Sequence, residues 1–286
     1  MWSEDKTHQD TQETLCHPVS SSSVSVSDFE TNEMETVVRY RRGGLRVGEV
    51  WFGDRKPTRC DILKYIQAPR KPTSVQAVRF TTLCIDVTQP PERVLSSFSP
   101  ETRKAVRRAE ARDGFVHEFD LHPDGRLITE FKTFYSEFCR LKGLPIGRLW
   151  HLDALAQQGA LTLSIARAAS GNALVWQSYL ISGNRARALQ GGSLFRNFAG
   201  SSDRDMMGRA NRWLHWRDMC ALKEAGVVTY DLGGWYSGHN DQEKLRINRF
   251  KEGFGGTLTV GYSWIQGNSL IGKLAVWLHH FRTSVP

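Results

Sequence analysis

The regular alternation of strand and helix patterns from residue 36 onward is the feature that most constrains the fold. Short runs rich in β-branched and aromatic residues, such as "ETVVRYRR", "LRVGEVWFG" and "FVHEFD", have the pattern of strands. Longer segments such as "LITEFKTFYSEFCRLKG" and "DRDMMGRANRWLHWRDMCALKEAG" have the pattern of amphipathic helices. Strands that alternate with helices in this way predict an α/β (α+β) fold with mixed strand pairing.

The order of elements starts again near the middle of the chain, around residues 143–152. After this point "ALTLSIARAASGNALVWQSYLISGNRARALQGGS" has the pattern of three successive strands, a long helix follows, and "VVTYDLGG" and "TLTVGYSWIQG" have the pattern of strands. We therefore predict two adjacent halves, residues 36–146 and 147–286, each with a mixed central sheet.

Residues 1–35 differ from the rest in composition and charge. They are rich in Ser, Thr, Asp and Glu, and hold eight acids against one base, a net charge of −7. This composition predicts a disordered acidic tail. Because the whole chain has a net charge of +8, the remaining residues carry +15. Such a basic body favours an anionic partner, namely a nucleic acid, nucleotide, phospholipid or phosphorylated sugar, with solubility alone as the alternative.

Cysteine usage and hydropathy point to a reducing, aqueous compartment. The five cysteines are scattered and form no CxxC pair, which favours free thiols and argues against a structural zinc site. The sequence has no apolar run of about 18 residues and no visible secretory signal, so we expect a cytoplasmic protein without a transmembrane helix.

A basic helix is predicted around residues 99–114, where Ser99 suits the N-cap, Pro100 the first turn and Gly114 the stop. Its cations fall into two rows, which are Arg103 with Arg107, and Lys104 with Arg108 and Arg112. These five residues are candidate phosphate or RNA contacts, although a charged row is also typical of a solvated helix face. The C-terminal segment "SLIGKLAVWLHHFRT" predicts a further amphipathic helix, which either packs on the body or makes peripheral contact with a membrane.

Two neighbouring motifs, "VVTYDLGGWYSGHND" and "RINRFKEGFGG", are the strongest candidates for a functional site. The first is an apolar strand that ends at Asp231 before two glycines, and the second places Lys251 between aromatic and glycine residues. Lys251 is a candidate for stabilising an oxyanion or binding a phosphate, with a surface lysine as the alternative. Asp231 is a candidate for accepting a proton or orienting a nucleophile, with a turn-forming role as the alternative.

The order of these motifs resembles that of the Fem family of aminoacyltransferases, which have a GNAT-like fold. The resemblance rests on "YDLGG" followed by "RFKEGFGG", on "ETRKAVRRAEARDGFVHEFD", and on "ANRWLHWRDMCALKEAGVVTYDLGG", and covers most of residues 90–262. It implies two GNAT-like subdomains and formation of an amide bond from aminoacyl-tRNA, or from an acyl thioester in more distant relatives. The helical hairpin with which some members bind tRNA has no counterpart here, which puts the cell-wall substrate of the family in question.

The resemblance also implies that Phe250 and Lys251 lie by the donor. Further substrate-binding candidates are Arg249, Trp235, Tyr230 and Asn211. The tryptophans near the motif, including Trp213 and Trp216, could stack on a base or pack in the core.

We expect an acyltransferase without a tightly bound cofactor or metal. Aminoacyl-tRNA would be its co-substrate, and an amine on a small molecule, sugar nucleotide or peptide its acceptor. Acyl-coenzyme A is the alternative donor. Against it stands "DMMGRA", the stretch that aligns with a pyrophosphate-binding loop, because Asp205 occupies the position of an expected cation or amide. A catalytically inactive module that binds RNA or anionic ligands is the alternative from a different class.

Overall fold

The computed structural model describes residues 36–73, 75–193 and 200–283, and the predicted acidic tail lies outside this range. The strands are β1 (Thr36–Arg42), β2 (Leu45–Trp51), β3 (Ile62–Ala68), β4 (Val78–Asp86), β5 (Val116–Asp120), β6 (Leu161–Arg167), β7 (Ala173–Ser182), β8 (Arg185–Ser193), β9 (Thr229–Gly234) and β10 (Thr257–Gly267). The α-helices are α1 (Pro91–Ser97), α2 (Pro100–Arg108), α3 (Gly125–Lys142), α4 (Trp150–Ala156), α5 (Ser201–Glu224), α6 (Gln242–Glu252) and α7 (Leu270–Thr283).

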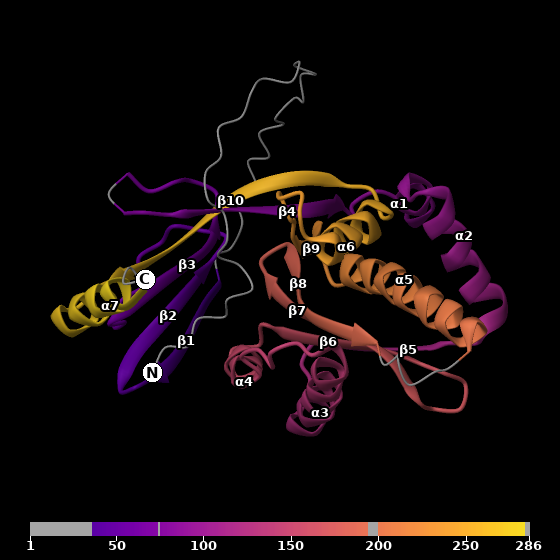
Figure 1. The fold of residues 1–286 in the computed structure, drawn as a ribbon, viewed down its shortest axis with the longest axis horizontal. Coiled ribbons are helices and arrows are strands. Elements are labelled where there is room, and N and C mark those ends of the chain that lie inside the picture. Colours follow the sequence, from indigo (N-terminus) through magenta and orange to yellow (C-terminus); the bar gives the residue numbers. More distant parts are fainter. Residues whose placement is uncertain (1–35, 74, 194–199, 284–286) are drawn as a thin grey trace, which may run out of the picture.

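All ten strands form one mixed sheet, in the order β1-β2-β3-β10-β4-β9-β8-β7-β6-β5 (Figure 1). The pairs β2 with β3 and β8 with β9 are parallel, and the other seven pairs are antiparallel. The α/β class with a mixed sheet is therefore confirmed. The last strand of the chain, β10, lies between β3 and β4, so the two halves share one sheet. The division at residues 146 and 147 stays a prediction.

The predicted ends of the basic helix are confirmed. The Ser99 hydroxyl accepts a hydrogen bond from the Thr102 amide at 3.2 Å, and Pro100 occupies the first turn of α2. Gly114 ends the helical segment with a φ of 62°, the left-handed conformation that glycine adopts without steric cost. A single π-helical turn (Ala109–Asp113), which we did not predict, continues α2 to this glycine.

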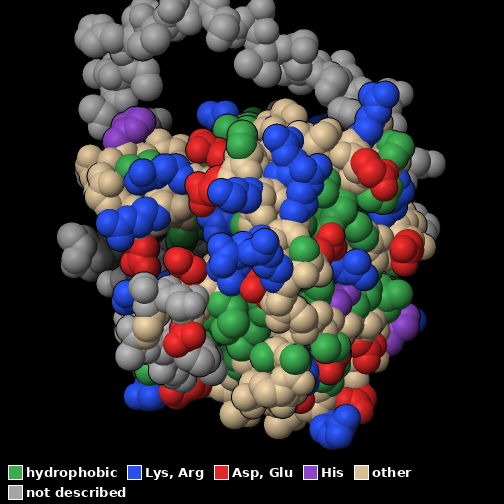
Figure 2. All heavy atoms as spheres, turned by 90° about the vertical axis from the view of Figure 1, so that its right-hand side faces the viewer, with side chains coloured by type: hydrophobic (Ala, Val, Ile, Leu, Met, Phe, Trp, Pro, Cys, Tyr) green, Lys and Arg blue, Asp and Glu red, His purple; other side chains and the backbone are tan. Residues whose placement is uncertain are grey.

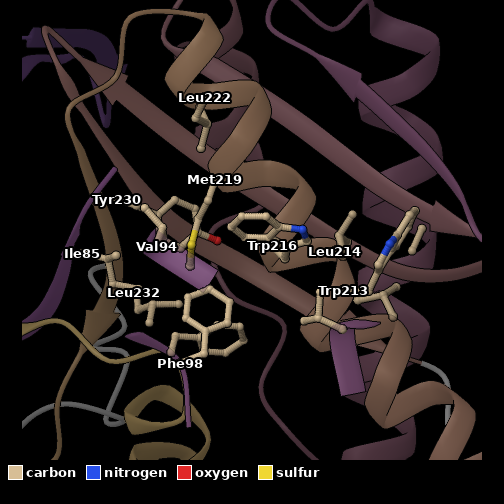
Figure 3. Close-up of a cluster of buried hydrophobic side chains, with 14 of the residues drawn as sticks. Ile85, Val94, Phe98, Trp213, Leu214, Trp216, Met219, Leu222, Tyr230 and Leu232 are labelled. Carbon is tan, nitrogen blue, oxygen red and sulfur yellow. The ribbon is translucent and has the colours of Figure 1, made fainter. Parts of the chain in front are cut away.

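The long helix α5 packs over one face of the sheet, while α3 and α4 lie on the opposite face (Figure 1). Beneath α5, the side chains of Trp213, Trp216 and Leu214 join residues of α1, β4 and β9 in the largest apolar cluster (Figure 3). Trp213 and Trp216 are each only 6% exposed, so they pack in the core and offer no surface for a stacked base.

Candidate active site

The two parallel strands β8 and β9 separate part-way along their length. They pair only from Arg185 opposite Thr229 to Arg187 opposite Asp231. Beyond this point β8 stays paired with β7, whereas β9 stays paired with β4 as far as Gly234. The carboxyl ends of the two strands therefore diverge, and the carboxyl ends of parallel strands are where α/β proteins often place a ligand.

Asp231 lies at the base of this divergence and is completely buried. Its carboxylate accepts hydrogen bonds from Arg185 Nη2 at 2.6 Å, from the Gly233 amide at 2.7 Å, and from the Thr82 hydroxyl. Burial alone would raise the pKa of Asp231, but the Arg187 and Arg185 guanidiniums outweigh it and hold that pKa below the usual value. The carboxylate is thus ionised and occupied by donors, which favours an anchoring role over proton abstraction.

Arg187 reaches from β8 towards the same carboxylate. Its Nε donates to Gln67 Oε1 at 2.6 Å and lies 3.8 Å from Asp231 Oδ2. The guanidinium occupies the space that a Cβ at position 233 would need, and Gly233 has a φ of 80°. Any side chain at position 233 would therefore collide with Arg187 and strain the backbone, which explains one glycine of "YDLGG".

Lys251 comes from the last turn of α6 and donates from Nζ to the carbonyl of Gly234, the last residue of β9. The structure therefore brings together the two motifs that the sequence placed side by side. Burial lowers the pKa of Lys251 to about 8, and the nearby Arg187 acts in the same direction. A mostly buried amine with this pKa is largely protonated at neutral pH, yet it loses its proton much more easily than a surface lysine.

The glycines of "RFKEGFGG" pack α6 against the start of the basic helix. The Gly253 carbonyl accepts a hydrogen bond from the Ser99 amide at 2.9 Å, and Phe254 is completely buried. Gly256 has a φ of 94°, and a Cβ there would run into the Cys84 carbonyl of β4. These glycines therefore serve close packing, and they hold Lys251 in place through the backbone around it.

A hydrogen-bonded network of polar side chains, which we call the polar network, lies beneath the site between α5 and the sheet. His215 Nδ1 lies 2.6 Å from the Tyr230 hydroxyl, which lies 2.8 Å from the Tyr179 hydroxyl. Tyr179 donates to Asp218 Oδ2 at 2.5 Å, and Asp218 Oδ1 lies 2.8 Å from His117 Nε2. Burial lowers the pKa of His215 to about 4, so its ring is neutral at pH 7.

Sequence reasoning missed the members of the polar network, apart from Tyr230. The available signal was in "WLHWRDM", where His215 and Asp218 are spaced to share one face of a helix among apolar residues. The Tyr230 hydroxyl belongs to the polar network, and the Tyr230 side chain therefore lies in the interior.

The other predicted substrate-binding residues differ in their surroundings. The Phe250 ring packs 5.7 Å from the His215 ring, and Asn211 Oδ1 accepts from Gln177 Nε2 at 3.4 Å. Trp235 directly follows β9 and is half-buried, whereas Arg249 is exposed on α6. Phe250 therefore lies on α6 next to Lys251, and Trp235 follows β9, whose last carbonyl Lys251 contacts. Arg249 is exposed to solvent.

Figure 2 looks at the side of the molecule on which α2 lies, and Lys and Arg side chains gather there with a few acids between them. Lys104, Arg107, Arg108 and Arg112 are exposed. Arg103 is half-buried and donates to the Ser96 carbonyl at 2.8 Å. Because the N-terminus of α2 contacts the Gly253 turn, the basic helix begins beside the motif and extends away from it.

The interpretation of "DMMGRA" as a pyrophosphate-binding loop was wrong. Residues 205–210 lie inside α5, where backbone amides bond within the helix and cannot bind a phosphate. The segment that precedes α5 is residues 194–199, which lies outside the described part of the chain. The argument from Asp205 against a coenzyme A donor therefore has no structural basis.

No protein-family model matches this sequence, and no curated protein is significantly similar to it. Solved structures do match. FemX superimposes with a TM-score of 0.58 and 13% identity, over 88% of both chains. The chain has the fold of FemX. The C-terminal domain (DUF2156) of a putative lysylphosphatidylglycerol synthetase from Agrobacterium fabrum matches with a TM-score of 0.50 and 14% identity, over 85% of this chain and 84% of that one. A conserved protein of unknown function from Bacteroides thetaiotaomicron matches with a TM-score of 0.50 and 7% identity, over 81% of this chain and 82% of that one.

In this FemX-like fold, the GNAT-like architecture that the sequence predicted is confirmed. At these low identities the likeness concerns the fold alone, and the roles of Lys251, Asp231 and the other site residues stay predictions.

Proposed function

We propose that this protein is an acyltransferase that joins an activated aminoacyl group to an amine. The observation that carries the proposal is Lys251, a partly buried cation held at the end of β9, beyond the point where β8 and β9 separate. The fold shared with FemX, and with a domain of a putative lysylphosphatidylglycerol synthetase, supports the same reaction class.

The reaction needs stabilisation of a developing negative charge. The nitrogen of the acceptor amine attacks the carbonyl carbon of the donor ester, and a C–N bond forms while the carbonyl oxygen becomes an oxyanion. The Lys251 ammonium stabilises this oxyanion in a site largely shielded from water. The C–O bond to the donor then breaks, and the leaving oxygen takes up one proton in exchange for the one that the attacking nitrogen loses.

Asp231 contributes to the reaction by positioning two guanidinium groups. Its carboxylate fixes the guanidinium of Arg185 and draws in that of Arg187, so positive charge stays next to Lys251. Arg187 helps to lower the pKa of Lys251, whereas the Asp231 carboxylate itself raises it. Asp231 is therefore a positioning residue, in place of the proton acceptor suggested as one alternative by the sequence.

Aminoacyl-tRNA is the donor that we propose, because the body of the chain carries +15 and the basic helix α2 begins beside the motif turn. An acyl-coenzyme A thioester is the alternative donor. The acceptor would be an amine on a small molecule, a sugar nucleotide or a peptide.

The test measures loss of the aminoacyl group from charged total tRNA in the presence and absence of candidate amines, with acetyl-coenzyme A as the competing donor. We expect deacylation that depends on the amine, and Lys251→Ala should lower its rate by roughly 100-fold or more, the usual effect of losing one oxyanion donor. Arg246→Ala removes an exposed cation from the same helix, outside the candidate site residues, and should leave the rate unchanged.

Normal turnover by a folded Lys251→Ala variant would assign the lysine a structural role. Turnover of acetyl-coenzyme A alone would identify the thioester as the donor. No turnover with either donor, together with tight binding of uncharged tRNA, would favour the inactive binding module.

A further inference from the structure

The C-terminal helix α7 turns an apolar face to solvent. Its outward side chains are Leu270, Ile271, Leu274, Trp277 and Leu278, which are 83%, 65%, 56%, 60% and 43% exposed. They recur at the spacing that places residues on one face of an α-helix. Single exposed leucines are common on proteins, but five large apolar side chains on one helix face mark an interaction surface.

The first turn of α7 is fixed firmly to the body. The Asp61 carbonyl accepts hydrogen bonds from the Asn268 amide at 2.8 Å and the Ser269 amide at 3.3 Å. Asp61 is itself held by Arg46 through two side-chain hydrogen bonds of 3.0 Å. Gly272 lies so close to the Asp61 carbonyl that no Cβ would fit there. The outward direction of the apolar face therefore results from specific packing.

The charged residues of α7 itself have a single sign. Lys273 is exposed beside the apolar side chains, and His279, His280 and Arg282 follow in the sequence of α7. After Glu252 the sequence contains no acidic residue. A second copy of the same face would bring cations together without an acid to pair with them, whereas an anionic surface would complement them.

The helix is too short to cross a bilayer, since it has 14 residues and about 20 are needed. In the described part of the chain, no helix has both the length and the hydropathy of a membrane span. A basic amphipathic helix with Trp and Leu on its apolar face has the properties of one that lies in the plane of the membrane interface.

We propose that α7 docks this protein on the surface of a membrane that contains anionic lipids. The apolar face enters the boundary between headgroups and acyl chains, and Lys273 contacts the lipid phosphates. The site lies beside β3, at the opposite end of the molecule from α2 (Figure 1), and the proposal does not depend on the transfer reaction.

Vesicle flotation tests the proposal with the full chain. We expect the protein to float with vesicles of phosphatidylcholine and phosphatidylglycerol at a ratio of about 3:1, and not with phosphatidylcholine alone. The double variant Leu274→Glu and Leu278→Glu should lower the partition coefficient by about tenfold or more, because it places two charges in the apolar face. Leu258→Glu, at a 47% exposed leucine of β10 outside this face, is the matched control and should float like the unmodified protein.

Circular dichroism and the unfolding midpoint show whether the double variant keeps its fold, as expected for changes at exposed positions. Equal flotation of the double variant would show that the basic body alone binds the vesicles and would overturn the proposal. Failure of the unmodified protein to float would do the same. A dimer seen by light scattering, and abolished by the double variant, would instead assign the face to a second copy of the chain.

Discussion

At the scale of single residues, the site combines two buried groups of opposite charge with different surroundings. Asp231 has donors on both carboxylate oxygens, whereas Lys251 has one carbonyl partner from β9 in the structure. The first group is therefore stabilised in its charged form, and the second is pushed towards its neutral form. This contrast leads to two predictions about stability.

The first concerns the pH dependence caused by Lys251. Its pKa is about 8 in the folded state and 10.5 in the unfolded state, so the unfolded chain binds more protons between these pH values. The free energy of unfolding should therefore rise with pH across this window, by up to about 3 kcal/mol from this group. Lys251→Met should remove that rise.

The measurement is the difference between the two proteins in urea unfolding at pH values from 7 to 10.5. Lys64, whose pKa burial also lowers to about 8, contributes equally to both and cancels. A difference that stays constant with pH would contradict a buried, destabilised ammonium at position 251.

Asp231→Asn removes the charge that pairs with Arg185. A buried guanidinium then remains without its anion, which typically costs about 3–5 kcal/mol of stability. Asp241→Asn is the matched control, because Asp241 caps α6 by accepting from the Lys244 amide and asparagine caps equally well. Urea unfolding of Asp231→Asn at an unchanged midpoint would rule out the anchoring role.

At the scale of elements, local signals explain what the sequence predicted and what it missed. The bounds of α2 were predictable because Ser99, Pro100 and Gly114 act within one turn of the helix end. The meeting of "YDLGG" with Lys251 was predictable only as a resemblance, since it depends on the path of α6. The polar network from His215 to His117 joins α5 to strands far away in sequence, so the spacing of His215 and Asp218 could indicate a shared helix face but not their partners on the sheet.

The exposed cations of α2, and of the π-helical turn that continues it, lead to a prediction about donor binding. If tRNA binds along this helix, the logarithm of its affinity should fall with the logarithm of salt concentration by about 0.7 to 0.9 per phosphate contacted. Replacing Lys104, Arg108 and Arg112 with Glu should reduce this slope. Replacing the exposed Arg70 and Lys71 in the loop between β3 and β4 should not.

Filter binding at several salt concentrations measures these slopes. An equal slope in the α2 variant and the unmodified protein would place the phosphate contacts on another surface. A shallow slope in the unmodified protein would favour coenzyme A, which offers only a few phosphates.

At the scale of the whole molecule, the sequence predicted the strands better than their arrangement. Periodicity identified β10 as a strand, but its pairing with both β3 and β4 joins residues from the two ends of the described chain. Such pairing is set by the complementarity of whole strands, which short patterns do not encode. One sheet shared by both halves was therefore not predictable from the repeated order of elements.

The position of β10 has a consequence for how the protein is made. On the ribosome, β3 and β4 emerge long before the strand that belongs between them, and each has an unpaired edge until that strand arrives. Folding in order of synthesis is therefore blocked, since the earliest strands wait for one of the latest. Throughout that interval the nascent chain has at least two open strand edges, the kind of surface that chaperones protect from aggregation.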